Sequence, residues 1–348
     1  MRIKGFDFLR VMAVIAVFLF HYQSFNNPNQ HFRSHLPWLQ NHISGFGFLG
    51  VDCFFIISGA VIVKTSKKRT PSAFLKARVL RLLPAMAVIF PILFFIERFT
   101  NISSRGKSFP DYNSLLFTNF VSGSSALDDV LWSLWIELHF YLIVAFILYV
   151  SRKQNFFLIS FGLLNLVIFY APGINGILAE VFQPLFLPYF LFGGVLGYVE
   201  NLKELRIATP ILVYEGIFIL NSVKIRIGQT APQIIWKSEL NNAWGISIAA
   251  VLLISIYWMV RSSLKRKSTK ASPKLELLGR STYFFYLVHL TVAGSFANLV
   301  VRVFSLSDQS YIPFLSLFLF AVGTSIFFAK YVEKPLSAKI KSLLSFNN

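Results

Sequence analysis

The chain has 348 residues, of which 55% are hydrophobic and 14% are charged, and its mean hydropathy is +0.62. A soluble domain carries about a quarter of charged residues to cover its surface, so this composition excludes an ordinary soluble protein. The formal net charge is +18. Because there is a single cysteine, Cys53, the chain can form neither an internal disulfide nor a cysteine metal site.

Long apolar runs define the predicted fold. A membrane-spanning helix needs about 20 mostly apolar residues, since each adds about 1.5 Å across a hydrocarbon core of about 30 Å. We predict an all-α polytopic membrane helix bundle of about ten transmembrane helices, forming a single domain over 1–348 with both termini cytoplasmic. The predicted spans are 6–24, 46–63, 82–97, 132–150, 156–171, 181–199, 208–223, 243–260, 281–301 and 311–332.

Basic residues alternate between loops as this topology requires. The segments assigned to the cytoplasm contain 25 of the 33 Lys and Arg residues, and the segments assigned to the outside contain the other 8. This asymmetry follows the positive-inside rule. The same charge attracts the anionic headgroups of membrane lipids. Its division among the loops of a membrane protein argues against a nucleic-acid partner.

Ionisable residues inside the predicted spans are the best candidates for a functional site, because each costs about 2.5–3.5 kcal/mol at mid-bilayer on insertion scales. In the first span, Arg10 and His21 are eleven residues apart, which is three helical turns, so they share one face. Asp7 lies one turn before Arg10 on that face. The stripe is either a polar route through the bundle or an interfacial arginine and a histidine packed between helices.

Two further groups lie at the ends of the second and third spans. Asp52, near the start of the second span, is either a functional acid or a helix cap. Arg78 and Arg81 are one turn apart and are predicted to direct both guanidinium groups the same way. Such a pair suits a phosphate group, although anchoring at the cytoplasmic surface explains it equally well.

The fourth and ninth spans carry two more polar faces. Ser133, Glu137 and Tyr141 recur every four residues and form one stripe, on which Glu137 is a candidate acid. Tyr286 and His289 are one turn apart and are predicted to share a face. We interpret Ser133, Tyr141 and this second pair as either substrate contacts or structural polar residues.

The sequence predicts no metal site. His31 and His35 are spaced four residues apart, but they lie in an Asn- and Pro-rich stretch where a helix is not expected. The Asp128-Asp129 pair is interpreted as a solvated acidic pair before a helix. It is also the one candidate acidic pair for a glycosyltransferase, and it stands alone.

Six segments follow one another in order along nearly the whole chain. They are Asp7-x-x-Arg10 with His21, Gly50-Val51-Asp52-x-Phe54-Phe55-x-x-Ser58-Gly59, Arg78-x-x-Arg81, Trp132-Ser133-Leu134-x-x-Glu137-x-x-Phe140-Tyr141, Ser281-x-Tyr283-x-x-Tyr286-Leu287-x-His289 and Glu333-Lys334-Pro335. Together these segments resemble the acyltransferase-3 family of bacterial membrane O-acyltransferases. Many relatives carry a periplasmic esterase-like domain after the last helix, and we expect this chain to be the stand-alone form.

The resemblance implies transfer of an acyl group, usually acetyl from acetyl-CoA, to a hydroxyl of a surface glycan or lipid-linked oligosaccharide. It implies a multi-pass protein of the bacterial cytoplasmic (inner) membrane. Arg10 with His21 matches the critical pair of the family, and the Arg78/Arg81 pair matches its motif for the CoA donor.

From the residues, we expect His21 to act as general base or to carry the acyl group. We expect Asp52 or Glu137 to orient it. The alternative function is a transporter or glycolipid flippase, because polar stripes inside a bundle serve both kinds of protein.

Overall fold

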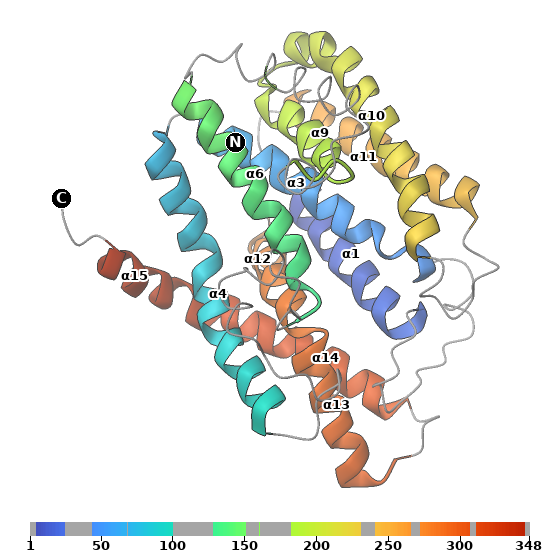
Figure 1. Ribbon diagram of the computed structural model, residues 1–348, viewed down its shortest axis with the longest axis vertical. Helices are drawn as coiled ribbons and strands as arrows, with labels where there is room; N and C mark the ends of the chain where they lie inside the picture. The colour runs from blue at the N-terminus through green and yellow to red at the C-terminus, as the bar shows by residue number, and fades with distance from the viewer. Residues whose placement is uncertain are drawn as a thin grey trace.

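The computed structural model describes residues 5–24, 44–67, 69–99, 128–150, 160, 182–230, 241–265, 272–306 and 311–344. Within these ranges the regular elements are all helices (Figure 1), which confirms the predicted all-α class. The principal helices are α1 (Gly5–Leu19), α3 (Leu49–Ser66), α4 (Pro71–Phe99), α6 (Leu131–Val150), α9 (Leu187–Tyr198), α10 (Leu202–Thr230), α11 (Asn242–Lys265), α12 (Pro273–Val288), α13 (Thr291–Phe304), α14 (Ile312–Phe327) and α15 (Glu333–Leu344).

Six helical stretches of the described ranges are long and apolar enough to cross a membrane, and α12 with α13 adds a seventh if this bent pair is one span. They coincide with predicted spans one to four, eight, nine and ten, so the polytopic bundle is confirmed. The predicted span 156–171 lies outside the described residues except for residue 160. The six stretches are Gly5–Gln23, Ser44–Ser66, Pro71–Ile96, Leu131–Val150, Asn242–Lys265 and Ile312–Leu343.

Two predicted helix ends are wrong. The span 208–223 lies inside the longer helix α10, which runs to Thr230, so Arg226 is a buried helix residue and not part of an outer loop. The last helical stretch does not end at residue 332, where the predicted span 311–332 ends. It continues through a π-helical turn, Phe328–Val332, into α15, where Pro335 occupies the first turn. Proline is tolerated there because the first-turn N–H groups have no partner within the helix.

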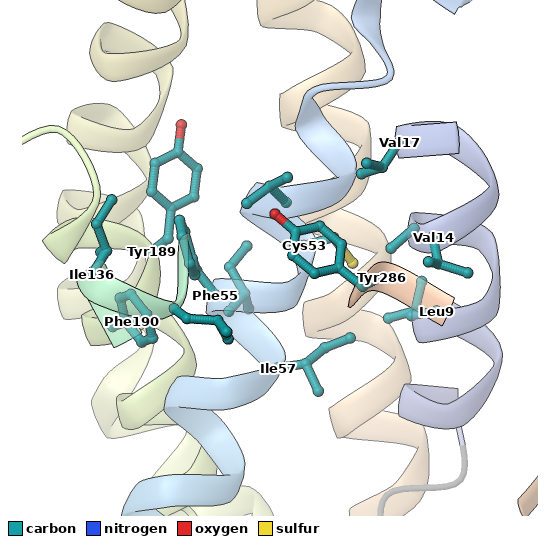
Figure 2. Packing of buried hydrophobic residues seen from close by; sticks show 14 of the residues in the cluster. Leu9, Val14, Val17, Cys53, Phe55, Ile57, Ile136, Tyr189, Phe190 and Tyr286 are labelled. Carbon is teal, nitrogen blue, oxygen red and sulfur yellow. The ribbon is translucent and has the colours of Figure 1, made fainter. Parts of the chain in front are cut away.

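The helix α3 forms the centre of the bundle, between α9 on one side and α1 on the other (Figure 2). Phe55 of α3 packs against Phe190 of α9, with ring centroids 4.7 Å apart. Three glycines bring these two helices into backbone contact, because Gly59 faces the Phe190 carbonyl, Gly193 faces the Ile56 carbonyl and Gly197 faces the Ala60 carbonyl. Small residues allow such approach, which is how helices associate strongly in membranes.

We expect Gly193→Ala to destabilise the detergent-solubilised protein by about 1–3 kcal/mol, as overpacking does. A Cβ atom at Gly193 would lie 1.9 Å from the Ile56 carbonyl oxygen, so the two helices would have to separate. Gly323→Ala in α14 is the matched control, because a Cβ atom there meets nothing within 4 Å. Alanine at that position should be neutral or stabilising, since it lowers the entropy of the unfolded chain. Equal melting temperatures for the two variants would contradict the close backbone contact between α3 and α9 at Gly193.

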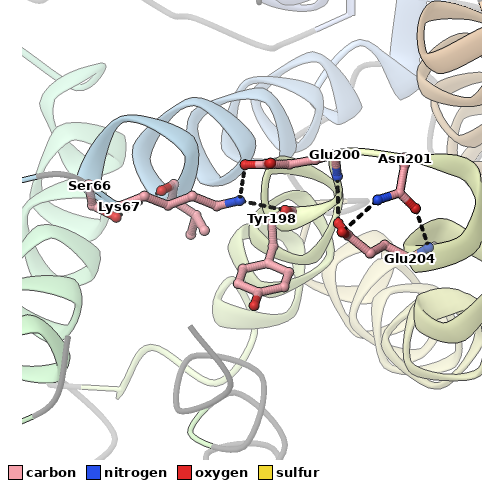
Figure 3. A network of polar contacts seen from close by, with 7 residues as sticks. Ser66, Lys67, Tyr198, Glu200, Asn201 and Glu204 are labelled. Atoms are coloured by element: carbon pink, nitrogen blue, oxygen red, sulfur yellow. Dashed lines mark hydrogen bonds and ion pairs between the residues drawn. The ribbon is translucent and has the colours of Figure 1, made fainter. Parts of the chain in front are cut away.

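A polar network joins the end of α3 to the α9–α10 connection (Figure 3). The Lys67 ammonium donates to the Tyr198 carbonyl at 2.6 Å and to the Glu200 carboxylate at 2.9 Å. The Asn201 side chain accepts from the Glu204 N–H at 2.9 Å, and the Glu204 carboxylate accepts from the Asn201 amide at 2.7 Å. This reciprocal arrangement resembles a capping box. It fixes where α10 begins relative to the packed pair of helices α3 and α9.

Candidate active site

A cavity of about 60 Å³ lies among α1, α3, α4, α6 and α12. It has room for a few water molecules and is smaller than the roughly 300–1,000 Å³ of typical ligand pockets. Five residues singled out from the sequence meet there: Arg10, Arg81, Ser133, Glu137 and Tyr286. The remaining lining residues are Val51, Phe54, Phe55, Ser58, Leu82, Leu134, Thr282 and Tyr283.

The cationic wall of the cavity comes from α1 and α4. The Arg10 guanidinium donates to the Asp7 carboxylate at 3.1 Å, and Asp7 is buried. Asp7 packs directly on α12, because a Cβ atom at Gly279 would lie 2.6 Å from its Oδ1. Arg81 is exposed and also lines the cavity.

Arg78 is in a different environment from Arg81. It is buried and donates to the Thr65 hydroxyl at 3.0 Å. Its guanidinium also lies over the rings of Phe74 and Tyr141, at 5.4 and 5.9 Å from the centroids. The two arginines therefore do not present equivalent groups to one ligand: Arg81 faces the cavity, whereas Arg78 is held by the protein.

The three polar residues predicted to form one stripe on α6 make two separate sets of hydrogen bonds. The Tyr141 hydroxyl donates to the Glu137 carboxylate at 2.7 Å, next to Arg78. The Ser133 and Tyr286 hydroxyls lie 2.8 Å apart, and both reach the Val130 carbonyl, at 3.1 and 3.2 Å. Ser133 therefore links α6 to α12 at the wall of the cavity.

His21 and His289 face each other, with ring centroids 5.3 Å apart and planes at 54°. Both occur where a helix loses its regular geometry. His21 lies in a π-helical turn, Phe20–Ser24, that follows α1, and His289 lies at the 68° bend between α12 and α13. Such π-helical turns are frequent at functional sites.

The bend is held by Tyr22, whose hydroxyl donates to the His289 carbonyl at 2.7 Å and to the Leu290 carbonyl at 3.1 Å. Backbone groups freed at an interrupted membrane helix need such internal partners. Tyr286 connects this bend to the cavity, because it lines the cavity and its ring centroid lies 5.5 Å from that of His289. A line of polar groups thus runs from Arg81 through Tyr286 to the two histidines, although His21 is not itself a lining residue.

Asp52 lies away from this line. It is buried and forms an ion pair with Arg226 of α10, whose guanidinium is packed over the rings of Phe48 and Phe186 at 5.0 and 4.9 Å. It is not among the cavity-lining residues, and the start of α3 has no side-chain cap. Asp52 and Glu137 were the acids predicted to orient His21. In the structure Asp52 pairs with Arg226 and Glu137 with Tyr141, and the ring that lies against His21 is that of His289.

We expect Asp52→Asn to destabilise the protein by about 3–5 kcal/mol, because it leaves the buried Arg226 charge without its counter-charge. The double variant Asp52→Leu/Arg226→Met removes both charges and should recover much of this loss. The measurements are the melting temperature in detergent and the rate of acyl transfer. If the double variant were as stable as wild type but inactive, Asp52 would have a role in catalysis and not only in stability.

Several polar residues of the described ranges were missed or misread from the sequence. Asp128 is fully buried, and its carboxylate accepts from the Val130 N–H at 3.1 Å just before α6, so its predicted solvation is wrong. Thr291, Ser295 and Asn298 form a buried stripe along α13 after the bend. Their i, i+4, i+7 spacing was a readable signal in the sequence. The described residues contain no cluster that would hold a metal ion, and His31 and His35 lie outside them.

Comparison with known proteins identifies the family. An acyltransferase domain model matches residues 3–330. The chain belongs to the acyltransferase-3 family. This confirms the resemblance seen in the sequence, and the apolar helices confirm the prediction of a multi-pass membrane protein.

The chain is similar to the O-acetyltransferase OatA of three Staphylococcus aureus strains, NCTC 8325, COL and MRSA252. Each is 25% identical over 386 residues, which cover 97% of this chain and 57% of the relative. This acyltransferase therefore matches little more than half the length of those relatives. No solved structure matches it.

Proposed function

We propose that this acyltransferase moves an acyl group, in the first instance acetyl, from cytosolic acetyl-CoA to a hydroxyl of a surface glycan or lipid-linked oligosaccharide. The site of action is the bacterial cytoplasmic (inner) membrane. The names of the relatives support O-acetyl transfer. The observation that carries the proposal is the polar line from the Arg81-lined cavity to the His21–His289 pair.

In this proposal the nucleotide phosphates of the donor bind at the cytoplasmic side, where Arg81 and Arg10 line the cavity. Guanidinium groups bind phosphate oxygens through charge-assisted, bidentate hydrogen bonds. The thioester arm needs more room than about 60 Å³. The donor-bound state therefore differs from this one by a widening of the cavity toward Tyr286.

His21 then acts on the acceptor. Its imidazole takes the proton of the acceptor hydroxyl as the hydroxyl oxygen attacks the thioester carbonyl carbon. The carbon–sulfur bond breaks, and the proton passes from the imidazolium to the departing CoA thiolate. In the alternative scheme His21 first carries the acyl group itself. Accumulation of acylated protein when the acceptor is withheld would identify that scheme.

The test is transfer by the purified protein. Protein reconstituted in vesicles should release CoA from labelled acetyl-CoA when the acceptor glycan is supplied, and surface glycans of cells with the protein should be heavier by acetyl units. Movement of an intact glycolipid across the vesicle membrane without CoA release would favour the flippase alternative. Absence of both activities with a full set of surface glycans would overturn the proposed donor and acceptor.

A further inference from the structure

The Tyr286 carbonyl determines which ring nitrogen of a neutral His289 carries the proton. Its side chain is fully buried, and Nδ1 lies 2.7 Å from the Tyr286 carbonyl oxygen. A carbonyl oxygen only accepts, so Nδ1 is the donor of this bond. In a neutral imidazole the second nitrogen, Nε2, is then an acceptor.

Nε2 of His289 has no hydrogen-bond partner among the described residues. The hydroxyl of Tyr286, its neighbour on α12, is already bonded to Ser133 and the Val130 carbonyl. Across the helix boundary, the ring facing His289 is that of His21. A centroid separation of 5.3 Å lets two ring nitrogens reach hydrogen-bonding distance when the ring edges meet. Hydrogen bonds of catalytic groups often tighten in this way only when substrate is bound.

We propose that His289 is a positioning residue for acyl transfer: its Nε2 accepts the N–H of His21 and so directs the other, unprotonated His21 nitrogen toward the hydroxyl of the acceptor. This inference rests on the proposed function. A carboxylate usually has this place beside a catalytic histidine. Here Asp52 is paired with Arg226, and Glu137 accepts from Tyr141. A neutral acceptor orients His21 without placing another charge inside the membrane.

The backbone is arranged to keep the two rings together. Tyr22 directly follows His21, and its hydroxyl is bonded to the carbonyls of His289 and Leu290. The π-helical turn that carries one histidine is thereby attached to the bend that carries the other. The position of the His289 acceptor relative to His21 is therefore fixed by bonds that neither imidazole has to make.

Two substitutions at His289 separate positioning from a structural role. In His289→Asn the amide occupies the place of Nδ1 and keeps the bond to the Tyr286 carbonyl, but no acceptor remains at the place of Nε2. In His289→Gln the amide reaches the place of Nε2 and can accept from His21. We expect Gln to keep kcat within about tenfold of wild type and Asn to lower it by at least about 100-fold, with KM for acetyl-CoA unchanged in both. The reverse order, or wild-type kcat in the Asn variant, would overturn the inference.

A second readout needs neither donor nor acceptor. In protein labelled with ¹⁵N-histidine, His21 should show one dominant tautomer in the wild type and in His289→Gln, and a mixture in His289→Asn. An unchanged His21 spectrum in the Asn variant would refute the positioning role even if the protein is active. The expected spectra in a protein that releases no CoA from acetyl-CoA would support the positioning role and reject the proposed donor.

Discussion

Replacing His21 with alanine is expected to lower acyl transfer by about 10²–10⁴-fold, the usual contribution of a general acid–base group. His21, in the π-helical turn after α1, faces His289 at the bend between α12 and α13, and the adjacent Tyr22 is bonded to the same bend. The rate of CoA release by reconstituted protein measures the effect. Membrane expression and the melting temperature should stay near wild type, because the imidazole is only partly buried.

A second histidine provides the control for this experiment. His139 of α6 is also partly buried, and its Nδ1 lies 2.9 Å from the Trp135 carbonyl, with the two rings in contact. Like His21 it does not line the cavity, but its hydrogen bond and its ring contact are with Trp135 of its own helix and not with His289. His139→Ala should therefore retain transfer. Wild-type rates in the His21 variant would refute its assignment, and equal losses in both variants would indicate a general effect of removing a histidine.

The sequence was sufficient for the helices because the bilayer imposes a length and a composition on each span. The second predicted span, 46–63, lies within the observed stretch Ser44–Ser66. It was not sufficient for the bend after Val288, since Leu287-Val288-His289-Leu290 contains neither proline nor glycine. Two carbonyls at that bend accept from the hydroxyl of Tyr22, which is 267 residues away from His289 in the chain.

The candidate site, like the fold, was predictable from the sequence only in part. Helical spacing alone brought Ser133, Glu137 and Tyr141 to one face and Tyr286 to the face of His289. The hydrogen-bond partner of each residue could be known only from the tertiary structure. Asp52, for example, is bonded to Arg226, which lies 174 positions later in the sequence. The role of Asp52 as an orienting acid could not be judged from spacing within one helix. The same holds for the difference between Arg78 and Arg81, which depends on Thr65 and on the rings beside Arg78.

Arg81→Gln is expected to raise the KM for acetyl-CoA by about 10- to 150-fold, the equivalent of losing one hydrogen-bonded charge contact of about 1.5–3 kcal/mol. Arg81 is exposed and lines the cavity, so its removal leaves no buried group without a partner. The melting temperature should therefore stay unchanged. Arg78→Gln should instead lower the melting temperature, because Arg78 is buried against Thr65 and Tyr141.

A truncated acyl donor provides the matched control for Arg81. S-acetyl-pantetheine has the same thioester and arm but none of the nucleotide phosphates. If Arg81 binds those phosphates, Arg81→Gln should leave the rate with S-acetyl-pantetheine unchanged while the rate with subsaturating acetyl-CoA falls. Added salt should weaken the wild type toward the variant with acetyl-CoA, since exposed charge pairs are screened. A similar loss with both donors would place Arg81 at the thioester or in the fold, and it would remove the phosphate site from the mouth of this cavity.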